Sequence, residues 1–134
     1  MSSQKVLDSY AFITLLENEL GADTVAALIK TARDLQKPLL MTVVNWGEIY
    51  YILKRESGEK VAQSVMEAMD TLTIDIVPVD KEITKAAAEF KASKKMSYAD
   101  CFAAALAKLK KADLVTGDKE FKEVQGEVKV VWLS

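Results

Sequence analysis

The stretch "SYADCFAAALAKLKKADLVTGD", residues 97–118, joins an alanine-rich helix to an apolar strand and an acidic turn. Ser97 and Asp100 stand three residues apart, as in a helix-capping box, and the run of alanines predicts a helix over 97–111. The segment 112–118 then predicts a short strand that runs into a Gly-Asp turn. A helix followed by a strand is the repeating unit of a parallel sheet.

Asp100 is the unusual residue of this stretch. It shares one helical face with Ala103, Ala104 and Ala107, at the i+3, i+4 and i+7 positions. A capping role explains an acid in the first helical turn, but it does not explain why the apolar, inward-looking face carries the charge.

The rest of the chain repeats the same alternation of helices and strands. Gly21 is expected to end the first helix and Pro38 the second. The predicted strands are 5–8, 39–42, 73–79, 112–118 and 127–133, and the predicted helices are 9–20, 22–37, 43–56, 59–72, 80–95 and 97–111, with helical turns at 119–124. Strands separated in this way by helices predict an α/β fold with a parallel sheet covered on both faces. Its 134 residues are expected to form one domain, 1–134.

The amino-acid composition limits the kinds of catalytic site that the chain can form. The chain has no histidine and one cysteine, Cys101, so a Ser-His-Asp triad, a Cys-His pair and a tetrahedral zinc site are excluded. Catalysis would have to use carboxylates, hydroxyls, lysines or an oxygen-bound metal. A net charge of −2 gives no overall basic field. We expect Cys101 to be a buried apolar residue, because it lies in the alanine-rich helix. A single cysteine cannot form an internal disulfide, and no signal peptide or membrane-spanning run is visible, so we expect a cytoplasmic protein.

Three further acids are placed so that they could join Asp100. Asp8 ends the first predicted strand, Asp118 follows the fourth, and Glu48 lies on the helix after the second. Each has a simpler interpretation: Asp8 as a helix N-cap, Asp118 as a turn residue, and Glu48 as a solvated helix position. In a parallel sheet, however, ligands bind at the carboxyl ends of the strands. Gathered there, the acids would need a cation between them, and Mg²⁺ or Mn²⁺ fits an all-oxygen site that can polarise a phosphodiester.

Four segments together resemble the PIN-domain family, especially its small VapC-like toxins. They are "VLDSYAFI", "VNWGEIYYIL", "SYADCFAAALA" and "DLVTGDKEF", and they occur in the family's order along essentially the whole chain. The resemblance implies a three-layer α/β/α sandwich with a five-stranded parallel sheet of order 3-2-1-4-5.

The resemblance also implies a metal-dependent ribonuclease. Asp8, Asp100 and Asp118 match the acids that hold the catalytic Mg²⁺ or Mn²⁺, and Glu48 matches the one that holds a second ion or orients the attacking water. Ser9 and Thr116 match hydroxyl positions beside the first and last acids. The family further implies an RNA substrate, a homodimer and a small antitoxin protein as partner.

Three other interpretations stay open. A receiver domain would want paired acids at the first strand, and a haloacid-dehalogenase phosphatase would want D-x-D, whereas this chain has Asp8, Ser9 and Tyr10. A catalytically silent PIN fold that binds nucleic acid or protein is the third.

Basic and aromatic side chains offer possible RNA contacts. Lys94 and Lys95 stand just before the Asp100 helix, where they could contact phosphates or simply solvate a helix end. Trp46, Trp132 and the pair Tyr50–Tyr51 could stack on bases, although core packing is the expected role of most of them.

Overall fold

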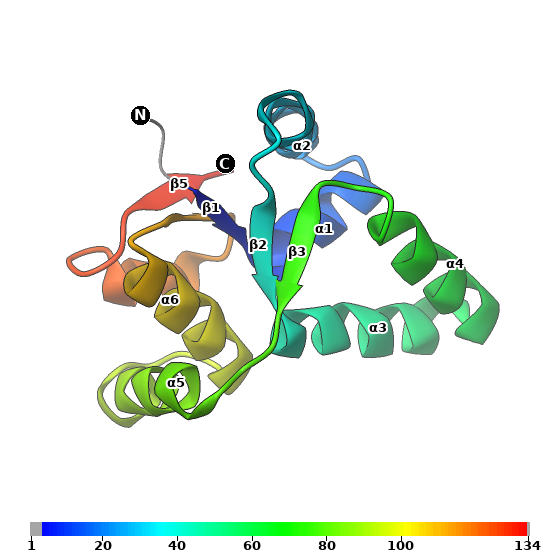
Figure 1. The fold of residues 1–134 in the computed structure, drawn as a ribbon. Coiled ribbons are helices and arrows are strands. Elements are labelled where there is room, and N and C mark those ends of the chain that lie inside the picture. Colours follow the sequence, from blue (N-terminus) through cyan, green and yellow to red (C-terminus); the bar gives the residue numbers. More distant parts are fainter. Residues whose placement is uncertain (1–3, 134) are drawn as a thin grey trace.

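A computed structural model describes residues 4–133 of the chain (Figure 1). Its elements, in chain order, are β1 (Lys5–Leu7), α1 (Ser9–Leu16), α2 (Ala22–Leu35), β2 (Leu39–Thr42), α3 (Val43–Ser57), α4 (Glu59–Met69), β3 (Ile74–Val77), α5 (Lys81–Ser93), α6 (Tyr98–Lys110), β4 (Asp113–Thr116), the 3-10 helix η1 (Lys119–Val124) and β5 (Val130–Trp132). The expectation about a signal peptide concerns residues 1–3, which lie outside the described residues, as does residue 134.

The strands form one parallel sheet. Across residues 4–133 it has five strands in the order β3-β2-β1-β4-β5, which confirms the expected 3-2-1-4-5 arrangement. β1 is central, with Val6 level with Leu40 of β2 on one side and with Leu114 of β4 on the other. β2 and β4 are buried throughout, as strands covered on both faces require.

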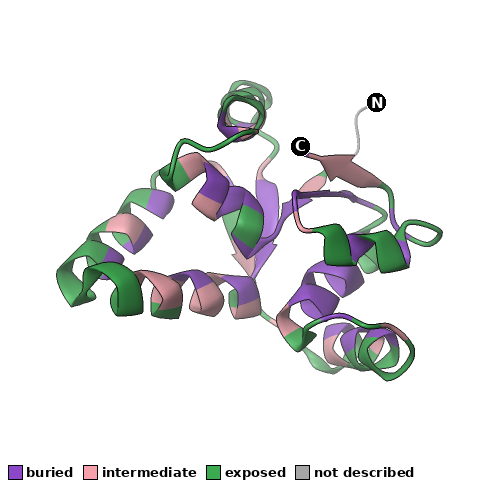
Figure 2. Cartoon of the chain, turned by 180° about the vertical axis from the view of Figure 1, so that it is seen from behind, coloured by how far each residue is buried: buried purple, intermediate pink, exposed green. Residues whose placement is uncertain are grey.

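Helices cover both faces of the sheet and give the molecule three layers. On one face, α5, α6 and η1 enclose a core that includes Phe90, Leu106 and Phe121. On the other face, α1 to α4 enclose a second core that includes Phe12, Ile49 and Met69. Figure 2 shows how the buried positions line the inner sides of these helices. The α/β/α sandwich is therefore confirmed.

α6 is the most deeply enclosed helix. Every residue from 101 to 107 is buried, and four of these seven are alanines. Small side chains let α6 approach both the sheet and the adjacent α5 closely (Figure 1). Cys101 is fully buried, as expected. This deep position carries the N-terminal turn of α6, and Asp100 with it, to the edge of the sheet.

Several element ends differ from the predicted ones. α1 stops at Leu16 rather than at residue 20, and Gly21 is the N-cap of α2 instead of the end of α1. Gly21 has φ 100°, and a Cβ there would lie 2.8 Å from Cβ of Leu133, so the glycine is required by a close approach of the chain end. The strands predicted over 73–79 and 127–133 shorten to 74–77 and 130–132. None of the helices within residues 4–133 has the length and apolar character needed to cross a bilayer.

Candidate acidic site

The acidic site lies at the carboxyl ends of β1 and β4, where parallel α/β sheets bind their ligands. A cavity of about 280 Å³ opens there. Its acidic lining consists of Glu19, Glu48, Asp100, Asp118 and Glu120, and Ser9 and Tyr10 also line it. Asp8 is not part of this lining; it is buried, with 1% of its surface exposed, and directly precedes Ser9 of the lining.

Asp8 is fixed by two hydrogen bonds. Its Oδ1 accepts the N–H of Ala11 at 2.8 Å, which makes Asp8 the N-cap of α1, and its Oδ2 accepts the hydroxyl of Thr116 at 2.5 Å. The Thr116 hydroxyl oxygen in turn accepts the N–H of Asp118 at 3.0 Å. The capping interpretation of Asp8 is thus correct, and the same carboxylate also links β1 to the β4 end that carries Asp118.

Burial raises the pKa of Asp8 to about 7. The hydrogen bonds from Thr116 and Ala11 lower this pKa, and the charges of Asp118 and Glu48 raise it further. A carboxyl group that resists ionisation in this way is stabilised as an anion by a nearby positive charge.

Asp100 faces the cavity because another acid completes its helix cap. Ser97 is the N-cap of α6, and its hydroxyl oxygen accepts the N–H of Asp100 at 3.2 Å. In a capping box the third residue of the helix would accept the N–H of Ser97, but here Oε1 of Glu120 accepts it at 3.0 Å. The carboxylate of Asp100 is therefore left to face the other acids. Burial, followed by the charges of Asp118 and Asp8, raises its pKa to about 8.

Glu120 is the acid that sequence reasoning did not select. Carboxylate oxygens of Asp100, Asp118 and Glu120 all lie within 4.8 Å of one another. Asp118 caps η1 by accepting the N–H of Glu120 at 2.9 Å, so the turn that fixes one acid also fixes the next. The available signal was the Asp-Lys-Glu sequence at 118–120, which places two acids on one turn.

Glu48 reaches the site from α3. Its Oε1 accepts a hydrogen bond from the hydroxyl of Ser9, the residue after Asp8. Asn45 holds α3 in place through two hydrogen bonds. Its backbone N–H donates to the hydroxyl of Thr42, the N-cap of α3, at 3.0 Å, and its side-chain amide donates to the carbonyl of Ala99 at 3.4 Å. Asn45 is fully buried and thus ties the start of α3 to the first turn of α6.

The structure therefore brings the four predicted acids and both predicted hydroxyls together. The two predicted lysines lie elsewhere. Nζ of Lys94 is 3.8 Å from a carboxylate oxygen of Glu127, and the backbone N–H of Lys95 donates to Glu123 at 3.2 Å. Neither lysine is part of the lining of the acidic cavity.

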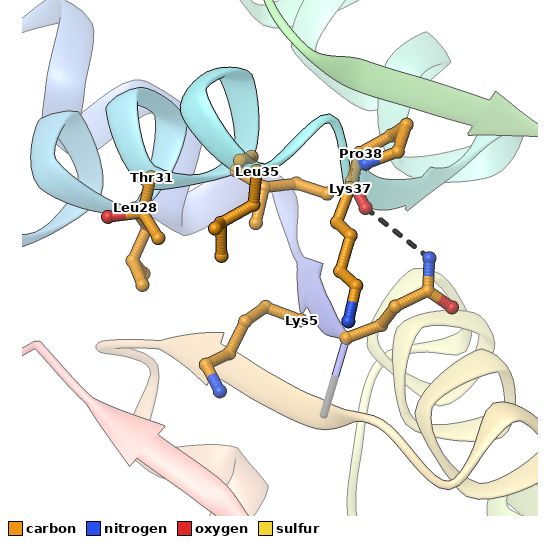
Figure 3. A pocket seen from close by; sticks show the side chains of 9 residues that line it. Lys5, Leu28, Thr31, Leu35, Lys37 and Pro38 are labelled. Carbon is orange, nitrogen blue, oxygen red and sulfur yellow. Dashed lines mark hydrogen bonds between the residues drawn. The ribbon is translucent and has the colours of Figure 1, made fainter. Parts of the chain in front are cut away.

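A different cavity, of about 180 Å³, lies at the opposite end of β1 and β2, under α2. Figure 3 shows the aliphatic side chains of Leu28 and Leu35 beside it, with Lys5 and Lys37 at its rim. Lys5 pairs with Asp113 at 2.8 Å. This cavity has no acid in its lining and no link to the acidic site.

We compared the chain with protein families and with curated protein sequences, and one family matches. The family model described as "PIN domain" matches residues 5–127. None of the curated protein sequences matches the chain significantly.

Solved structures share the fold over nearly the whole chain. A toxin–antitoxin complex from Klebsiella pneumoniae is 19% identical with a TM-score of 0.67, covering 98% of both chains. VapBC2 from Rickettsia felis, bound to a promoter DNA fragment, is 13% identical with a TM-score of 0.77, covering 97% of this chain and 98% of that one. VapC20 from Mycobacterium tuberculosis, described as a sarcin-ricin loop cleaving toxin, is 16% identical with a TM-score of 0.70, covering 95% and 98%.

Proposed function

Because the chain belongs to the PIN-domain family, we propose that it is a Mg²⁺- or Mn²⁺-dependent endoribonuclease. The observation that carries the proposal is the group of acids at the carboxyl edge of the sheet, where carboxylate oxygens of Asp100, Asp118 and Glu120 lie within 4.8 Å of one another. We further propose that the protein is the toxin of a type II toxin–antitoxin pair. The similar folds of a VapBC complex and of an RNA-cleaving toxin support this part of the proposal.

The donor atoms fit a hard divalent cation. All of them are carboxylate or hydroxyl oxygens, which Mg²⁺ and Mn²⁺ prefer, and no histidine or free thiolate competes for the site. Burial, and after it the charges of neighbouring acids, raise the pKa values of Asp8 and Asp100, and a bound cation would favour the ionised form of both groups. We assign Asp8, Asp100 and Asp118 as holders of the ion, and Glu120 as a fourth candidate.

When bound, such an ion supplies positive charge that polarises a phosphodiester and makes water more acidic. The chain's own residues do the rest. Ser9 orients the Glu48 carboxylate by donating to it, so Glu48 can hold a second ion or accept a hydrogen bond from the attacking water. Thr116 holds Asp8 in one rotamer by its hydrogen bond, which fixes the site before substrate arrives.

Four properties belong to the same proposal. An RNA strand is the substrate, a small antitoxin is the partner that silences the enzyme, and the chain works as a homodimer in the cytoplasm. The similar structures include a toxin–antitoxin complex and a VapBC complex, which supports the antitoxin.

The alternative is a catalytically silent PIN fold that only binds nucleic acid or protein. The experiment that separates the two is cleavage of a fluorescently labelled RNA with Mn²⁺, with Mg²⁺ and with EDTA. We expect cleavage with either metal, none with EDTA, and a large loss in Asp8→Asn and Asp118→Asn. Asp23→Asn, the same change at an exposed position on α2, is the matched control. Equal cleavage by all of these variants would contradict the proposal.

A further inference from the structure

A second cavity adjoins the acidic site on the other side of the β4–η1 turn. Its volume is about 250 Å³, and it is lined by Gly117, Lys119, Lys122 and Trp132. Gly117 precedes Asp118 and Lys119 follows it, so the same short turn presents its acid to one cavity and its neighbours to the other.

Trp132 gives this cavity an aromatic wall close to the acids. β5 pairs with β4 so that Trp132 is level with Thr116, the residue that holds Asp8. Adjacent strands are about 4.8 Å apart, so the tryptophan lies one strand away from the acidic site. Its side chain is half-buried and packs in part against the core beneath α6 and η1. The ring is therefore held in place while part of it faces the cavity.

The two lysines of the cavity carry uncompensated charge. Lys119 and Lys122 are exposed, and neither has an ion pair with any acid in residues 4–133. Lys94 and Lys108, by contrast, both pair with Glu127. Two free ammonium groups beside an aromatic ring match a phosphate and its base.

Tyr10 and Gly117 form the boundary between the two cavities. Tyr10 lines the acidic cavity and is exposed at its rim. A Cβ on Gly117 would lie 2.4 Å from Cε1 of Tyr10, so the tyrosine ring rests directly on the glycine backbone. A residue that lines the acidic cavity therefore touches a residue that lines the cavity with the lysines.

We propose that this second cavity binds a nucleotide of single-stranded RNA next to the phosphate that is cleaved. Trp132 stacks on the base, and Lys119 and Lys122 contact the phosphate. The assignment rests on the proposed function in one respect, that the substrate is RNA. It adds a subsite that selects an unpaired base beside the cleavage point.

Binding without cleavage provides the test. The chain has two tryptophans, so Trp46→Phe leaves Trp132 as its only indole. In EDTA, where no metal-dependent cleavage occurs, we expect a short single-stranded RNA to quench the fluorescence of this variant. An abasic strand of equal length should bind through the lysines without quenching. Trp132→Leu, which keeps an apolar side chain, should weaken binding of the RNA at least about fivefold.

The lysines are tested by salt dependence. For single strands, the magnitude of the slope of log affinity against log salt falls by about 0.7 for each phosphate that is no longer neutralised. Because both lysines contact the same phosphate in the proposed subsite, the double variant Lys119→Ala/Lys122→Ala should lower this magnitude by about 0.7. Lys30→Ala/Lys60→Ala, with the same charge change on exposed positions of α2 and α4, should leave it unchanged.

The outcomes separate this subsite from the proposed function. Quenching by RNA in a protein that never cleaves RNA would support the subsite while the enzyme assignment fails. Cleavage by a protein whose Trp132 fluorescence does not respond, and whose salt slope is the same in both double variants, would overturn the subsite alone. Quenching of equal size with the abasic strand would overturn base stacking.

Discussion

Three acids of the site have a structural role as well as their proposed chemical one. Asp8 caps α1, Asp118 caps η1, and Glu120 completes the cap of α6. These hydrogen bonds fix the carboxylates in place, and burial, followed by the charges of the neighbouring carboxylates, raises the pKa of Asp8 and of Asp100. The structural and chemical roles of these acids are therefore best separated by substitutions that keep the shape and hydrogen bonding of the side chain but remove its charge.

Glu120→Gln is the change that tests the unpredicted acid. The amide oxygen can still accept the N–H of Ser97, so the cap of α6 should survive while the charge near Asp100 and Asp118 is lost. We expect the affinity for Mn²⁺ to fall about tenfold or more, measured by calorimetric titration. Glu123→Gln, an exposed neighbour on η1, is the control. Unchanged Mn²⁺ affinity in Glu120→Gln would confine Glu120 to its capping role.

Asp100→Asn is expected to make the metal-free protein less sensitive to pH. The folded-state pKa values of Asp8 and Asp100, about 7 and about 8, exceed the ordinary value of 3.8. The native state thus binds more protons than the unfolded chain between about pH 4 and about pH 8, so the free energy of unfolding falls as pH rises through this range. Removing one of the two groups should raise the melting temperature strongly near pH 8 and much less near pH 5.

Thermal unfolding in EDTA at both pH values measures this effect, with Asp23→Asn as control. If the side chain of Asp100 does no more than occupy a helical turn, the Asn variant will melt with the wild type at both pH values.

At the level of elements, the site depends on how α3 and α6 meet. Asn45 is the connection, because it joins the Thr42 cap of α3 to the carbonyl of Ala99 in α6. Asn45 is fully buried, and among residues 4–133 no other side chain donates a hydrogen bond to the carbonyl of Ala99.

Asn45→Ala should therefore destabilise the fold and displace Glu48 relative to Asp100. Leaving buried polar partners unsatisfied costs about 1–3 kcal/mol of unfolding free energy, which urea unfolding can measure. Gln63→Ala, at an exposed position of α4, should cost less than about 0.5 kcal/mol. RNA cleavage should fall in Asn45→Ala even at temperatures where the variant is fully folded. Full cleavage by the folded variant would show that α3 is positioned by its apolar contacts alone.

The sequence predicted the presence of the helices and strands more accurately than the residues at which they begin and end. Alternation of apolar runs and amphipathic segments was enough to find each strand, while the strand order came only from the family resemblance. Gly21 was misassigned because a glycine after a helix usually ends it, and its contact with Leu133 is not visible in local sequence. Glu120 was missed for the same reason: its partner Ser97 lies 23 residues away in the chain, and only the packing of η1 against α6 brings them together.

At the level of the whole molecule, metal binding and folding should be linked. An ion that binds only the native arrangement of acids stabilises it by about 2.7 kcal/mol when free metal is 100 times the dissociation constant. For a chain of 134 residues this corresponds to a rise in melting temperature of about 10 °C. We expect Mn²⁺ to produce such a rise in the wild type at neutral pH and to lose most of it in Asp100→Asn. An equal response of both proteins would place the ion elsewhere.

The central position of β1 in the sheet determines when the acidic site can form during translation. Asp8 is translated before β2, β3 and β4, yet the strand beside it, β4, and the turn carrying Asp118 and Glu120 follow all the helices from α1 to α6. A nascent chain therefore cannot assemble the full set of acids until β4 and η1 have left the exit tunnel. If the protein cleaves RNA through these acids, it cannot do so before β4 and η1 have been translated.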